Sequence, residues 1–271
     1  MQKTIKYVMV AFVAIISIAS CKKEINWNAK FANGENGCKL ASVDTDLGIL
    51  GQYSINYTYD ASGKLSKATS GGESRIYTYT ETKITGVLPD GERTELTISG
   101  GKAISSYNSD FFNVNGTSVP VTRTYTYNAD GYLSVIKSYL DKNLNSTAEL
   151  TYSNGNLTQS KITYAEDGEI ETTTYEYSSQ LAVNPYETSD PISVIVDYMP
   201  GGYFGKHSKN VVVKSIQRLS NLDGQLISDY SYKFDAKGNA IYTSVKSEQK
   251  LGDGTILNES TAIFNLVYNC K

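Results

Sequence analysis

The stretch RTYTYNADGYL, residues 123–133, contains a complete strand–turn–strand pattern. Its two tyrosines alternate with threonines, and a period of two places both rings on one face of a β-strand. Asn128 suits the first position of a turn, and Gly131 accepts the positive φ angle that closes a type I turn with a bulge. Leu133 then restarts the alternation. The stretch therefore predicts a β-hairpin.

The same unit recurs along the chain. An aromatic residue stands four positions before a glycine in INYTYDASGKL (55–65), TYAEDGEI (163–170) and SYKFDAKGNA (231–240). Degenerate copies occur at residues 77–79, 96–101, 152–155 and 175–177. No segment after the N-terminal apolar run shows a convincing apolar period of 3.6 residues, which a helix would need. We expect a single all-β domain at residues 41–271, an antiparallel meander of hairpins in a curved or partly rolled sheet.

Residues 179–210 interrupt the repeats. Three prolines and the glycines at 201, 202 and 205 argue against a central strand over most of this stretch, with residues 192–196 as a candidate short strand. We expect a long functional or capping loop that closes one edge of the sheet. After it, the pattern predicts final strands at residues 211–219, 227–234, 240–247 and 262–268.

The first residues have the charge and apolarity pattern of an exported protein. Two lysines precede an apolar run that ends in IASC, residues 18–21, which resembles the lipobox of bacterial lipoproteins. The resemblance implies a signal peptide at residues 1–20 that is cleaved before Cys21, and lipid on that cysteine. An Asn-rich flexible tether would follow, with the anchor and tether together at residues 21–40. The alternative is an ordinary signal peptide, with Cys21 buried or disulfide-bonded.

The units of the type TYTYNADGYL resemble the YD repeats of the RHS family, in which successive hairpins spiral into long sheets and shells. The chain of 271 residues is far too short for a closed RHS shell. Together, the lipobox, the tether and the YD-like hairpins are more similar to small Bacteroidota lipoproteins of unknown function. This resemblance implies an outer-membrane lipoprotein of the cell envelope, on either the periplasmic or the outer face, and it implies no activity.

Cys38 and Cys270 remain once Cys21 is assigned to the lipid. Outside the cytosol a disulfide between them is compatible with their environment, and it would close a loop of over 230 residues (270 − 38). The alternative is two unrelated thiols, because sequence alone does not show that two Cα atoms are close.

The sequence contains no catalytic constellation. One histidine excludes sites built from two or more histidines, and no phosphate-binding glycine loop, CxxC pair or nucleophile elbow is present. The chain has 25 basic and 28 acidic residues, and this near balance gives no sign of the basic surface that nucleic-acid binding requires. We therefore expect no enzymatic activity, no cofactor and no bound metal.

The candidate ligand contacts are four residues of the loop: Tyr203, Phe204, Lys206 and His207. They combine aromatic and cationic side chains with the one side chain whose ordinary pKa lies near neutrality. The alternative interpretation is an exposed loop histidine beside ordinary lysines.

The 22 tyrosines allow two interpretations. Rings on an exposed sheet face would suit stacking on sugars, whereas rings packed across strands would form the core of a domain with 7 Phe and 1 Trp. We favour core packing, because rings shared by successive hairpins must cover something. The expected protein is a monomer with a non-catalytic binding or scaffold role, whose partner is a glycan or an envelope protein. The alternative is a carbohydrate-binding or glycan-degrading component of a polysaccharide-utilisation system.

Overall fold

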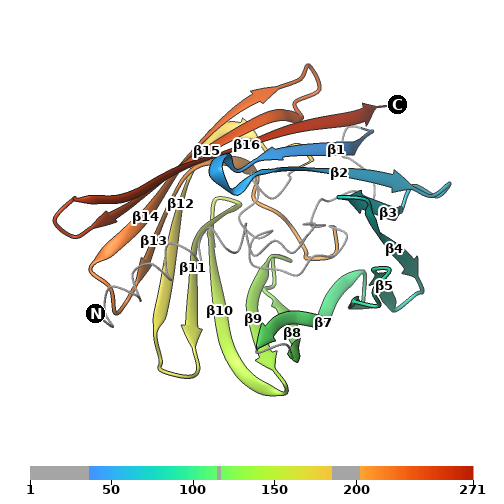
Figure 1. The fold of residues 1–271 in the computed structure, drawn as a ribbon, viewed down its shortest axis with the longest axis horizontal. Helices are drawn as coiled ribbons and strands as arrows, with labels where there is room; N and C mark the ends of the chain where they lie inside the picture. The colour runs from blue at the N-terminus through green and yellow to red at the C-terminus, as the bar shows by residue number, and fades with distance from the viewer. Residues whose placement is uncertain (1–36, 115–116, 185–201, 271) are drawn as a thin grey trace.

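The protein is a closed antiparallel β-barrel of sixteen strands (Figure 1). The computed structural model describes residues 37–114, 117–184 and 202–270; the expected signal peptide, Cys21 and the strand at 192–196 lie outside this part of the chain. Strands follow one another in chain order around the barrel, and β1 (Cys38–Asp46) pairs with β16 (Ile256–Cys270) to close it. The expectation of a curved or partly rolled sheet is therefore wrong. Pairing of the first and last strands over eight residue pairs leaves no open sheet edge.

The other strands differ widely in length, and Figure 1 shows long ribbons for β12–β16 and short ones for β3–β5. A short 3-10 helix, η1 (Gly48–Leu50), joins the first two strands. In chain order the strands are β2 (Gln52–Tyr59), β3 (Leu65–Ser70), β4 (Glu73–Tyr79), β5 (Lys83–Val87), β6 (Arg93–Ser99), β7 (Lys102–Val114), β8 (Thr117–Tyr127), β9 (Leu133–Leu140), β10 (Asn143–Ser153), β11 (Asn156–Tyr164), β12 (Ile170–Leu181), β13 (Asn210–Leu219), β14 (Gly224–Phe234) and β15 (Ala240–Leu251).

Several boundaries differ from those that the sequence pattern predicts. β1 begins at Cys38, so the barrel starts before residue 41, because its first residues pair with the end of β16. β12 extends to Leu181, which shortens the long connection to residues 182–209. The four final strands are present, and the last three are longer than predicted because ladder pairing continues through polar residues. Among the described residues, no helix is long and apolar enough to cross a membrane.

Successive hairpins place their turns alternately at the two ends of the barrel. We call the end that holds Cys38, Cys270 and the connection 182–209 the disulfide end, and the opposite end the far end. Within the described chain, the far-end connections have two to five residues, whereas the disulfide end also holds the long connection.

Three turns at the disulfide end share one hydrogen-bond pattern. In residues 60–64, 128–132 and 235–239, the first backbone N–H donates to the fifth carbonyl, and the glycine N–H donates to the first carbonyl. The side chain of the first residue also accepts from the fifth backbone N–H, at 2.9, 3.0 and 2.8 Å respectively. The glycine φ angles of 87°, 88° and 83° lie in the left-handed region that glycine tolerates. The turn predicted for these repeats is therefore confirmed.

The tyrosines of the Tyr-x-Tyr units point into the barrel. In five units, a tyrosine hydroxyl donates at 2.8 Å to a carbonyl on the preceding strand: Tyr59 to Leu40, Tyr79 to Leu65, Tyr127 to Ala103, Tyr177 to Leu157 and Tyr232 to Val212. Two positions earlier, a second tyrosine lies deeper; Tyr57, Tyr77 and Tyr125 are all less than 8% exposed. The interpretation of the rings as core is confirmed.

The apolar core fills the half of the barrel beside the disulfide end. Several of its fully buried aliphatic side chains lie close to the turns at that end, as Leu65 and Leu133 illustrate at the starts of β3 and β9. Threonines between the tyrosines, such as Thr58 and Thr126, face outward and are exposed. The period of two thus separates a packed interior from a polar outer face.

Candidate functional site

Two of the four predicted ligand contacts anchor the long connection to the barrel. Phe204 is 8% exposed, and its ring meets Tyr125 edge-on with centroids 5.2 Å apart. The carbonyl of Tyr203 accepts hydrogen bonds from the Ala103 backbone N–H at 2.8 Å and from the Tyr127 hydroxyl at 3.2 Å. Phe204 and Tyr203, which the sequence pattern predicts as ligand contacts, are thus part of the packing of the barrel.

The other two predicted contacts lie nearer the surface. Lys206 is exposed, its backbone N–H donates to the Gly131 carbonyl at 3.1 Å, and its ammonium lies 5.4 Å from the centre of the Tyr132 ring. His207 is half-buried, with Nδ1 2.6 Å from the Ser208 carbonyl.

Close approach of two backbones fixes the connection at Gly205. A Cβ at this position would lie 2.5 Å from the Gly131 carbonyl, and the φ angle of 78° also favours glycine. Gly205 forms an isolated bridge with Tyr132. Residues 202–209 therefore lie against the disulfide end as a fixed part of the barrel.

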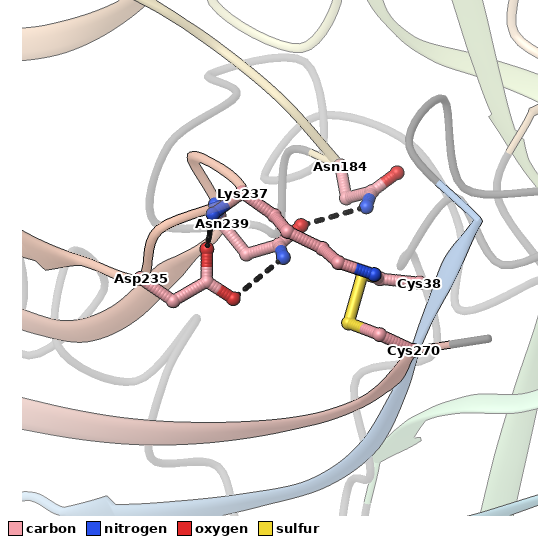
Figure 2. The surroundings of a disulfide bond; sticks show 6 residues. All are labelled: Cys38, Asn184, Asp235, Lys237, Asn239 and Cys270. Atoms are coloured by element: carbon pink, nitrogen blue, oxygen red, sulfur yellow. Dashed lines mark hydrogen bonds between the residues drawn. A yellow bond between two sulfur atoms is a disulfide. The ribbon is translucent and has the colours of Figure 1, made fainter.

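A disulfide joins Cys38, the first residue of β1, to Cys270, the last residue of β16. Asn184 of the connection donates to Asn239 at 2.8 Å, and Asn239 donates to Asp235 at the same distance (Figure 2). The disulfide holds the start of β1 to the end of β16, and the hydrogen bonds hold the last repeat turn to the long connection at the same end of the barrel.

The far-end half of the interior is polar along β12–β16. Register places serines of four adjacent strands in one row, with Ser215 and Ser228 both buried: Ser215, Ser228, Ser247 and Ser260. Two residues nearer the far end, a second row contains Thr173, Gln217, Leu226, Gln249 and Asn258. We call these two rows, together with Tyr164 and Glu171, the inner polar wall.

Glu171 is the acidic side chain of the inner polar wall. It is two residues from the buried Thr173 on the same face of β12, and Tyr164 donates to its Oε2 at 3.2 Å. Burial raises the pKa of Glu171, and hydrogen bonds from Tyr164 and Gln217 oppose the rise. The carboxyl group can accept hydrogen bonds from a hydroxyl or amine donor.

Serine–tyrosine and serine–serine pairs order the rest of this wall. The Ser228 and Ser247 hydroxyls lie 2.8 Å apart, and Ser215 lies 3.2 Å from the Tyr230 hydroxyl. Hydroxyl groups both donate and accept, so the wall can match either kind of polar group on a ligand.

The opposite side of the interior carries a buried ion pair. Arg75 is 5% exposed, forms a salt bridge of 2.5 Å with Glu92 and also donates to Thr94. Arg123 donates to Ser138 at 3.2 Å. Among the described residues, no group of three or more His, Cys, Asp and Glu side chains could hold a metal ion.

Sequence reasoning missed the inner polar wall. Serine, threonine and glutamine in alternation indicate a solvent-facing surface, and only closure of the barrel turns that surface inward. One available signal was the far-end part of β14 and β15, where GQLIS and SEQKL offer no clean apolar face although the strands continue.

Comparison with known proteins shows the fold and no family. No protein-family model matches the sequence, and no curated protein matches it. The chain is similar to a porin-like protein from Bacteroides uniformis, with a TM-score of 0.64 and 15% identity over 85% of this chain and 98% of that one. It is similar to a porin-like protein from Bacteroides vulgatus, with a TM-score of 0.59, 17% identity and the same shares.

Proposed function

We propose that this protein is a non-catalytic binding protein of the bacterial cell envelope. In this proposal the lipid on Cys21 holds a monomeric barrel beside the outer membrane, and the inner polar wall binds a hydroxyl-rich ligand of the carbohydrate class. The observation that carries the proposal is the polar interior of β12–β16, in a barrel whose other half is packed with apolar side chains.

Strand length and surface chemistry favour a barrel that stands in water. A membrane-spanning strand needs about 9–11 residues, whereas β3, β4, β5 and β6 have 6, 7, 5 and 7. The outer face of β6 carries Glu95, which forms ion pairs with Lys83 at 2.9 Å and with Arg93 at 3.5 Å. A lipid-facing surface would instead carry an apolar band between aromatic girdles.

Barrel size supports binding in the interior. Barrels of about eight strands are filled by their side chains, and those of about sixteen leave space in the lumen. Amide and hydroxyl groups of the inner polar wall match the alternating donors and acceptors of a sugar. Hydrolysis would need a second carboxyl group about 5–10 Å from Glu171, and the residues that define the wall supply only this one.

The test is a glycan array with the purified full chain, followed by calorimetric titration of any glycan it retains. The inner double variant Gln217→Ala with Gln249→Ala should weaken binding about tenfold or more, because each amide removed leaves ligand polar groups unpaired. The matched control is Gln159→Ala with Gln225→Ala, since register places these two glutamines on the opposite, outer face. A blank array, or equal losses of affinity in both variants, would refute the proposal. Co-purification of an envelope protein would then support a scaffold role with that protein as the partner.

A further inference from the structure

The two ends of the barrel differ in charge. The described far-end connections contain eight carboxylates and one lysine: Asp90, Glu92, Asp141, Lys142, Glu166, Asp167, Glu169, Asp223 and Asp253. Among the described residues of the disulfide end, seven lysines lie in connections or at the starts of strands, against four carboxylates in the connections. Lys83 forms an ion pair with Glu95 on the outer face. We call the other six the lysine rim: Lys39, Lys64, Lys102, Lys206, Lys209 and Lys237.

Aromatic rings position most of the rim. Lys39, Lys64 and Lys102 place their ammonium groups 5.1, 5.1 and 4.9 Å from the ring centres of Tyr59, Tyr79 and Tyr127. These are tyrosines of the repeat units, so three of the five units bring a cation to the same end of the barrel. Cation–π contact of this kind holds an ammonium in place and leaves its other side able to meet an anion.

Two rim lysines converge on one turn. A Cβ placed on Gly131 would lie 3.5 Å from Nζ of Lys102 and 3.9 Å from Cε of Lys206. Lys209 lies beside the neighbouring turn, because a Cβ placed on Gly155 would lie 3.5 Å from the Cβ of Lys209. The carboxylates at this end are partly engaged by the turns, as Asp60 accepts from the Lys64 backbone N–H and Asp235 from that of Lys237.

We propose that the lysine rim docks on anionic lipid headgroups, so that the disulfide end faces the membrane and the far end faces away. The described barrel begins at the disulfide end with Cys38, so a tether from Cys21 would reach the barrel at the rim. Basic residues near an anionic surface are attracted within about one Debye length, and the acidic far end is repelled. This docking does not depend on a ligand in the interior.

The experiment measures vesicle partitioning of the full chain with Cys21→Ser, so that acyl chains do not contribute. The vesicles are pure phosphatidylcholine, or phosphatidylcholine with phosphatidylglycerol at about 30%. The rim variant is Lys64→Glu, Lys206→Glu and Lys209→Glu, all exposed side chains. The control variant makes the same change in net charge outside the rim, by Lys137→Glu, Lys142→Glu and Lys246→Glu, and these three side chains are also exposed.

The unmodified barrel and the control should partition onto the anionic vesicles, with a difference of about twofold or less between them. The partition coefficient of the rim variant should be lower by about tenfold or more, and about 0.5 M salt should remove the binding of all three proteins. N-terminal lysines are common to the three proteins and cancel in the comparison. Equal losses in rim and control variants would show a non-directional charge effect and overturn the proposal, as would a rim variant that binds like the unmodified chain. Thermal unfolding of each variant verifies that it is folded.

Discussion

Removing the disulfide by Cys38→Ala with Cys270→Ala should lower the free energy of unfolding by about 5 kcal/mol. The two cysteines are 232 positions apart, so the bond closes a loop that includes nearly the whole barrel. In the chain-entropy model, a loop of this length restricts the unfolded chain by about 18 cal/mol/K, and that entropy multiplied by 298 K gives the stated magnitude.

The native barrel should survive this change. β1 and β16 remain joined by eight registered residue pairs, and Cys38 is 1% exposed, so alanine leaves only a small space in the packing. The far-ultraviolet circular dichroism of the double variant should therefore match that of the unmodified protein. The loss of stability would come mainly from the greater freedom of the unfolded state.

Guanidinium unfolding of the oxidised protein, the reduced protein and the double variant provides the assay. The reduced protein and the double variant should agree with each other, and Cys21→Ala should leave stability unchanged. A loss of less than about 1 kcal/mol would refute the entropic reasoning, because the loop length fixes the expected size. Loss of the β-sheet signal without denaturant would show instead that strand pairing alone does not close the barrel.

Three further predictions concern the packing and the interior. Phe204→Ala should lower the free energy of unfolding by about 3–5 kcal/mol, because it removes a buried ring, whereas Lys206→Ala should change it by less than about 0.5 kcal/mol; chemical denaturation of both variants tests this contrast. Tyr127→Phe should cost about 1–3 kcal/mol in the same assay, because it removes the donor to two carbonyls, and Tyr242→Phe on the outer face is its control. Burial raises the pKa of Glu171 in the folded state, so its ionisation opposes folding above the ordinary glutamate pKa and has no effect below it. Glu171→Gln should accordingly raise Tm near pH 7, with a difference that disappears near about pH 4; an equal or larger gain at acid pH would contradict this assignment.

The repeat units could be predicted because their chemistry is local. The Tyr-x-Tyr alternation, the Asp or Asn that opens the turn and the glycine with positive φ act within about ten residues, and the hairpins formed as expected. Core packing of the tyrosines also followed from this pattern. The packing of Tyr203 and Phe204 against the core could not be predicted in this way. Aromatic residues in a long loop do not indicate whether they face solvent or fill a barrel end.

Antiparallel hairpins with tyrosines on one face follow from local sequence, because each unit contains its own strand period and turn. Closure of the sixteen strands is a property of the whole fold, since it depends on the summed twist and register shifts of every ladder. Closure then placed Cys38 beside Cys270 and turned serines and glutamines of β13–β15 inward. No local pattern specifies these positions, because a polar face is the same in sequence whether it meets bulk water or the inside of a barrel.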